Sequence, residues 1–336
     1  MRYYDLTLTN PQTGAVVKHW TSHPNGQFDP GALNVMFDII TSVGSIAVGA
    51  QSIIVEGISL ADLGNAEQFG TVSLPKNKFT PGCNISLKGG MKAGLPLANP
   101  AQAGPLTIGA VQQSFGNWVG TDMSLALVVV PTIYTHHTPG NFVLNWQKDE
   151  PLAAALQLTL QTVYPKAKIT IKISPALVAT RSDISFHGTF SQLARHVKSI
   201  TEGTISATYL GVEMAPVAGG FTVFDGTTTP ATGSPQPVKT LTFTDFIGQP
   251  TWIRPSHIQV KTVMRGDIHV GDLVKFPAGF ENAPGFVQTT QASQPGYSRY
   301  KSIIQGQFFV AQVRHVGNFR DPDGGAWASI FNLVPN

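Results

Sequence analysis

The chain has 336 residues, of which only 12% are charged, and its formal net charge is +3. This length exceeds one ordinary hydrophobic core, so we expect two or three domains. The positive charge is spread out without a basic run, which argues against a sequence-reading nucleic-acid binder. The single cysteine, Cys83, excludes an internal disulfide and a cysteine-based zinc site.

The low charge also bears on the surface, because typical soluble domains have about 25% charged residues. A free monomer usually keeps a charged surface for solubility, so we expect partner subunits to cover much of this chain. The alternative is an extracellular β protein kept soluble by uncharged polar groups. Residues 1–9 alternate, which predicts a strand rather than a signal peptide. No apolar run approaches the roughly 18 residues of a membrane-spanning helix.

Residues 1–146 are predicted to form an N-terminal β domain, because short alternating segments are separated by turn residues. Ser59 is a plausible N-cap for a short helix that Gly64 weakens. The expected strands lie at 2–9, 16–20, 33–40, 52–56, 71–74, 83–89, 106–115 and 123–133.

Residues 147–203 change to a helical pattern and are predicted to form a small α/β unit. Leucines at 3–4 residue spacing predict a helix from Pro151 to Val163, and residues 167–173 alternate as a strand. Thr189 and Gln192 form a capping box that begins a second helix, which Gly203 ends.

Residues 204–336 return to a β pattern and are predicted to form a C-terminal β domain. The low-complexity loop 226–237 has almost nothing to bury, so we expect it to be mobile. The predicted fold class is therefore mainly β with a small α/β insertion. The expected strands lie at 206–213, 220–224, 307–316 and 326–334 and within 241–277.

Asp245, Asp267 and Asp272, together with His257 and His269, could be arranged as an acid and a base. Their places at strand ends and turns favour a backbone role, because Asp is common there for its local hydrogen bonds. We therefore predict no catalytic residue, and a hydrolase is the least favoured interpretation.

Other candidate sites are weak for similar reasons. His136 and His137 lie in a loop without acidic or cysteine neighbours, and Asp321 and Asp323 lack the later residues of a calcium loop. Cys83 shows no activating partner. A mild basic face on the α/β unit is expected to be solvated. Its residues are Lys166, Lys168, Lys172, Arg195 and Lys198. We predict no metal ligand, no cofactor-binding residue and no cofactor.

Several stretches resemble the baseplate hub proteins of contractile-tailed bacteriophages. The resemblance covers most of the chain at the level of pattern and includes no catalytic motif. It rests on 33–39, 54–63 and 66–69, on 163–165, 169–173 and 189–200, on 246–252 and 263–272, and on 309–317 with Trp327.

The resemblance implies two tail-tube-like β barrels in one chain, flanking the helix–strand–helix unit. It implies a homotrimer whose six barrels form a ring between the hexameric tail tube and the trimeric spike, in the baseplate of a virion. Implied partners are the tube protein, the spike protein and other baseplate or wedge proteins, with viral DNA only passing through the bore. The chain itself is not expected to insert into a membrane. Bore-facing side chains should then be neutral or acidic, because a basic lining would hold DNA.

A second interpretation is a β-rich tail-tip protein that binds a receptor or glycan. It predicts that Trp20, Trp118 or Trp252 is displayed in an exposed groove, whereas burial in the core is the usual place for tryptophan.

Overall fold

The computed structural model describes residues 1–44, 51–75, 78–92, 99–131, 141–165, 167–217, 220–227, 236–254, 257–277, 286–287 and 306–335. The protein is mainly β, as predicted, and its described helices are few and short. In these ranges no helix is long and apolar enough to cross a membrane.

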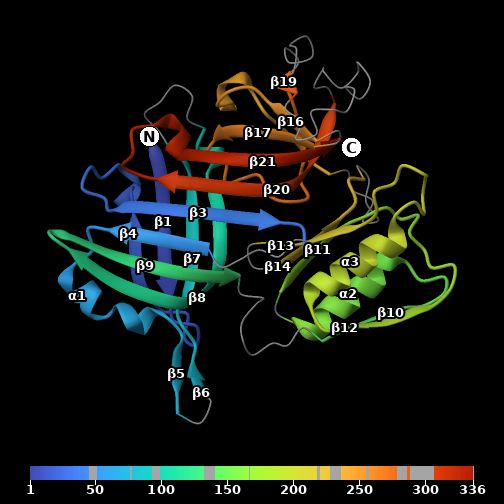
Figure 1. Cartoon of the computed structure of the whole chain (residues 1–336), viewed down its shortest axis with the longest axis horizontal. Helices are drawn as coiled ribbons and strands as arrows, with labels where there is room; N and C mark the ends of the chain where they lie inside the picture. Colours follow the sequence, from blue (N-terminus) through green and yellow to red (C-terminus); the bar gives the residue numbers. More distant parts are fainter. Residues whose placement is uncertain are drawn as a thin grey trace.

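Most described strands belong to one large, mostly antiparallel sheet (Figure 1). Its order is β19-β16-β17-β21-β20-β3-β4-β9-β8-β7-β1-β2, with β15 and β18 branching from β20. The strands are β1 (Arg2–Thr9), β2 (Val16–Thr21), β3 (Asn34–Ser42), β4 (Gln51–Glu56), β7 (Asn84–Met91), β8 (Gly104–Val119), β9 (Asp122–Pro131), β15 (Val238–Thr240), β16 (Thr251–Arg254), β17 (His257–Val263), β18 (Leu273–Lys275), β19 (Phe286–Val287), β20 (Gln307–Asn318) and β21 (Trp327–Pro335).

The pairing of β3 with β20 joins the N-terminal strands to the C-terminal strands. It runs from Met36 opposite Asn318 to Ser42 opposite Gln312. A bulge after Val310 divides β20, so its first residues pair with β18 and its later ones with β3. We call the β3–β20 pairing the seam. Among the described residues this sheet stays open, so neither predicted barrel closes by strand pairing.

Two separate hydrophobic cores lie against this sheet. In the N-terminal core, β1 and β7 cross behind β3 and β4 at a steep angle (Figure 1), and the buried side chains of Tyr4, Leu6 and Ile39 lie between them. Trp327 of β21 also belongs to this core, and its indole N–H donates to the carbonyl of Gly90 at 3.0 Å. The second core packs β17, β20 and β21 against the chain segment 268–276.

The third core belongs to the α/β unit, whose helices pack between two small sheets (Figure 1). The helices are α2 (Leu152–Val163) and α3 (Phe190–Thr201). One sheet pairs β10 (Phe142–Trp146) with β12 (Asp183–His187), and the other has the order β11-β14-β13, with β11 (Lys168–Lys172), β14 (Gly220–Phe224) and β13 (Glu213–Val217). Strand pairing therefore attaches β10, β13 and β14, which lie outside 147–203, to this unit.

The helix signals of the sequence are confirmed. Leu152, Leu156 and Leu160 are buried along α2, and Thr189 and Gln192 form the capping box that begins α3. The predicted helix after Ser59 is α1 (Leu60–Gly64), followed by the short 3-10 helix η2 (Ala66–Phe69).

One strand prediction was wrong, and one strand pair departs from the main sheet. Residues 206–212 are not a strand, because the chain turns there after α3 and β13 begins only at Glu213. The strands β5 (Val72–Leu74) and β6 (Lys78–Thr80) form a separate antiparallel pair, which projects from the body (Figure 1).

Candidate functional site

A buried ion pair lies behind the seam. Arg265 and Asp245 have side chains that are each only 4% exposed, and Arg265 Nη1 lies 3.1 Å from Asp245 Oδ2. Arg265 also donates to both carboxylate oxygens of Asp267, at 2.8 and 2.9 Å. Burial alone would lower the pKa of Arg265, but the two carboxylates outweigh it, so the net shift is upward. The amide of Gln102 donates to Asp245 Oδ1 at 2.9 Å, which ties the N-terminal half to this pair.

A second cluster of charges joins the α/β unit to the C-terminal strands. Asp272 lies 3.1 Å from Lys172 Nζ of β11 and 2.9 Å from Lys239 Nζ of β15, and it accepts the backbone N–H of His269. Burial would raise the pKa of Asp272, but its hydrogen bond with His269 and the charges of Lys239 and Lys172 outweigh burial. The pKa of Asp272 therefore lies well below its usual value, and its charge holds two units together.

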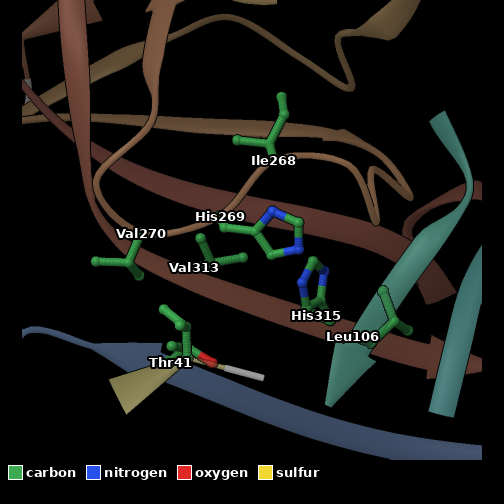
Figure 2. A pocket seen from close by; sticks show the side chains of 8 residues that line it. Thr41, Leu106, Ile268, His269, Val270, Val313 and His315 are labelled. Carbon is green, nitrogen blue, oxygen red and sulfur yellow. The ribbon is translucent and has the colours of Figure 1, made fainter. Parts of the chain in front are cut away.

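A small cavity lies between the N-terminal core, the second core and the end of β13, with the rings of His269 and His315 close together on its wall (Figure 2). His315 is 3% exposed, and its Nδ1 lies 2.8 Å from Ser329 Oγ, an atom that also accepts the backbone N–H of Arg265. Burial, reinforced by His269, lowers the pKa of His315 to about 3, so this ring is neutral at physiological pH. The other lining residues are Thr41, Leu106, Val217, Ile268, Val270 and Val313.

The acids considered for catalysis are therefore bound to cations rather than gathered in a cleft. Asp245 and Asp267 share Arg265, and Asp272 is held by two lysines. The cavity beside them has no carboxylate among its lining residues. His257, the remaining member of the set, lies at the start of β17.

The other candidate residues have structural surroundings. Cys83 is buried, and burial raises the pKa of its thiol, which disfavours the reactive thiolate. Asp321 and Asp323 accept the backbone N–H groups of Asp323 and Gly325, as in a turn. His136 and His137 lie outside the described residues. Within the described part, no group of three or more His, Cys, Asp and Glu could hold a metal ion.

The basic residues of the α/β unit do not form one free face. Lys172 pairs with Asp272, and Lys198 pairs with Glu213 of β13. Lys168 and Arg195 are exposed, while Lys166 lies outside the described residues.

The three tryptophans considered for a glycan groove differ in how far they are exposed. Trp252 is 5% exposed and Trp20 is half-buried against the N-terminal core, whereas Trp118 is 59% exposed. The indole N–H of Trp118 donates to the carbonyl of Gly120 at 2.9 Å, in the turn between β8 and β9. They therefore do not form one aromatic platform.

Exposed apolar side chains lie on two elements, the β8–β9 hairpin and the β10–β12 sheet, which are at opposite ends of the long axis (Figure 1). The strand face is formed by Val143, Ile184 and Phe186 of the β10–β12 sheet, which are 54%, 68% and 67% exposed. The hairpin tip carries Phe115, Trp118 and Val119 at the end of β8, which are 53%, 59% and 66% exposed. Phe115 and Val119 share one face of β8, and Trp118 lies on the other. Sequence reasoning missed the strand face, although the alternation in Asp-Ile-Ser-Phe-His at 183–187 carried a signal for it.

No protein-family model matches the sequence, and no characterised protein matches it at a significant level of similarity. The structure is similar to solved structures of tail proteins over nearly the whole chain. The tail protein of Neisseria meningitidis MC58 has a TM-score of 0.49 and 10% identity, with 99% of this chain and 97% of that chain covered. The 43 kDa tail protein of prophage MuSo2 from Shewanella oneidensis has a TM-score of 0.46 and 8% identity, covering 100% and 97%.

The c3393 protein of E. coli is a third similar structure, with a TM-score of 0.46 and 7% identity over 90% of this chain and 73% of that chain. It is described as a component of the type VI secretion system that is structurally similar to the T4 bacteriophage tail proteins gp27 and gp5. All three similarities have TM-scores below 0.5 and at most 10% identity.

Proposed function

We propose that this protein is the structural hub of a phage tail baseplate, acting as a homotrimer between the tail tube and the spike. The observation that carries the proposal is the seam, where β20 pairs with β3 on one side and β21 on the other. One chain thereby presents two β units, each with its own hydrophobic core, on a continuous sheet. This agrees with the tandem arrangement that the sequence resemblance implies.

In this proposal the two β units act as tube-like barrels, and neighbouring subunits complete them. Three chains with two units each form a ring of six, which matches the sixfold tube at one end and the threefold spike at the other. The units correspond to residues 1–146 and 204–336, on either side of the α/β unit at 147–203. The strand pairing of β10, β13 and β14 favours a wider middle unit than these borders allow.

The acids considered for catalysis form ion pairs with Arg265 and two lysines, which supports a structural rather than an enzymatic role. The Arg265–Asp245 pair holds two segments of the chain together, and Asp272 links β11 of the α/β unit to β15. A subunit that transmits force between tube and spike needs such connections between its parts. We propose that DNA only passes through the bore of the ring, with neutral or acidic side chains facing it.

The direct test is electron microscopy of the chain co-expressed with the tube and spike proteins of the same tail. We expect three copies in one layer, with the sixfold tube on one side and the threefold spike on the other. A single copy attached at the distal end of the tail would support the receptor-binding alternative instead. A strongly positive bore in that reconstruction would contradict the proposed DNA passage.

A further inference from the structure

Strand β12 has its polar side turned toward α3 and its apolar side turned toward solvent. Asp183, Ser185 and His187 are half-buried, whereas Ile184 and Phe186 are 68% and 67% exposed. A strand of an antiparallel sheet that packs on a hydrophobic core normally has the opposite arrangement. The attachment of β12 to the α/β unit therefore differs from that of an ordinary core strand.

The partner strand β10 shows the usual arrangement. Three of its side chains alternate inward and are buried in the core that α2 and α3 share, namely Phe142, Leu144 and Trp146. The register places them directly opposite the polar residues of β12, with Phe142 opposite His187 and Trp146 opposite Asp183. The apolar core thus ends between the two strands, and polar contacts must hold the inner side of β12.

A histidine of α3 makes these polar contacts. His196 Nε2 lies 2.9 Å from Asp183 Oδ2, and the ring of His196 lies against that of His187, with the two centroids 4.7 Å apart. The other described polar contact of His187 is with Ser185 of the same strand, at 3.0 Å between Nε2 and Oγ. Two histidines and one carboxylate therefore share the space between β12 and α3.

One carboxylate can neutralise one imidazolium but not two. A proton on His196 strengthens its contact with Asp183, whereas a second proton on His187 places two cations side by side. Burial lowers the pKa of His187, and the neighbouring His196 lowers it further, although Asp183 opposes both. The second proton is therefore unfavourable for as long as β12 stays attached.

The other charged groups nearby do not offset a second proton. They are Arg181, Arg195, Lys198, Asp149 and Glu150. The first three are cations, and Lys198 is already paired with Glu213 of β13. The two acids follow the far end of β10, whereas His187 pairs with Phe142 at its start. The strand β10 itself carries no ionisable side chain.

We propose that β12 is released from α3 when both His187 and His196 are protonated. The released strand binds more protons than the attached one, because attachment lowers the pKa of His187. Release therefore becomes more favourable as the pH falls below about 6.5, the ordinary value for histidine. It would uncover the backbone edge of β10 that β12 now pairs. The switch operates within one chain and does not depend on the proposed trimer.

Hydrogen exchange measures this release directly. Between pH 6.5 and 5.0 the protection factors of the amides at 183–187 should fall at least about fivefold in total. The uptake of one proton sets a limit of about tenfold per pH unit. Strand β11 serves as the internal reference, because it contains no histidine and the pKa of Asp272, which binds Lys172, lies well below this range. Equal behaviour of β12 and β11 would overturn the proposal.

The variant His187→Gln removes the second proton. Its β12 amides should keep the same protection throughout this pH range. His19→Gln is the matched control, because His19 is also a strand histidine beside an aspartate, with Nε2 3.1 Å from Asp5, but it lies on β2. The control should retain the pH dependence of the wild type. A His187→Gln protein that also retains it would contradict the assignment to this histidine pair.

A titration of the imidazole rings by NMR tests the contact between the two histidines without changing His187. In His196→Gln the pKa of His187 should rise, because the neighbouring ring that lowers it is gone. A pKa of His187 that is the same in the variant and the wild type would show that the two rings do not titrate as a pair, and would overturn the switch.

Discussion

The interior behind the seam and the two ends of the molecule distribute polar and apolar side chains in opposite ways. Behind the seam, the charged side chains of Arg265 and Asp245 are almost fully buried and paired. At the ends, Phe186 and Phe115 are more than half exposed. The buried charges of Arg265 and Asp245 are therefore paired within one chain, whereas the ends leave apolar groups exposed.

This difference distinguishes contacts that form within one chain from surfaces that a neighbouring chain would cover. Buried charges persist only when they are paired and hydrogen-bonded, so the interior must form within each copy. Clustered apolar groups in solvent mark surfaces of contact between chains. Substitutions behind the seam should therefore reduce folding stability, and substitutions at the ends should reduce assembly and leave folding intact.

The largest effect on stability is expected from Asp245→Ala. The Asp245 carboxylate accepts from Arg265, Gln102 and the backbone and hydroxyl of Thr242, and its removal leaves Arg265 buried with one partner fewer. We expect the free energy of unfolding to fall by about 3–5 kcal/mol. Urea denaturation measures this, and a loss below about 1 kcal/mol would show that the pair contributes little to folding stability.

A pH-dependent effect is expected from His315. Its folded pKa of about 3 lies below the ordinary value, so the unfolded chain binds more protons between these limits. Stability should therefore fall as the pH is lowered from about 6.5, by up to about 1.4 kcal/mol per pH unit from this group. His23 and His187 also have pKa values lowered mainly by burial.

The variant His315→Gln isolates this contribution. Between pH 6.5 and 4.5 its free energy of unfolding should depend less steeply on pH than that of the wild type. The difference in slope should correspond to about one proton bound on unfolding. Equal slopes for the two proteins would mean that His315 is not buried as a neutral ring.

A smaller effect is expected from Gly317→Ala at the seam. Gly317 of β20 lies opposite Phe37 of β3, and an added Cβ would overlap the Phe37 ring. We expect a loss of about 1–3 kcal/mol, typical of overpacking. Gly324→Ala is the control, because nothing lies near an added Cβ there. A thermal melt compares the two, and equal melting temperatures would contradict close packing at the seam.

The smallest effect is expected from Asp38→Asn, which removes the ion pair with Arg314 on the outer side of the same seam. The two side chains are 47% and 46% exposed, and such pairs contribute about 0–1 kcal/mol. The same urea denaturation applies. A loss as large as that of Asp245→Ala would show that exposure does not distinguish the two sides of the seam.

Local sequence patterns predicted both longer helices and many strands of this fold, but not β10 or β12. The leucines of α2, the capping box at Thr189 and the alternation of β11 each depend on neighbours within one turn or one strand. The seam could not be predicted in the same way, because Gln312 and Ser42 lie far apart in the sequence and their register depends on the folded sheet.

The candidate residues show the same limit. Asp245 and Asp272 stand out in the sequence, but the sequence does not show which cations they contact. The packing of the strands places Arg265 beside Asp245, and Lys172 and Lys239 beside Asp272. Likewise, Phe186 lies in a segment for which no strand was predicted, and only the pairing with β10 shows which side remains in solvent.

The native mass of the isolated chain, measured over a range of concentrations, tests the central claim most directly. We expect a species of about three times the 35.8 kDa mass of the single chain. A particle that remains at the mass of one chain at all concentrations would contradict an account in which the exposed ends of each copy are completed by its neighbours.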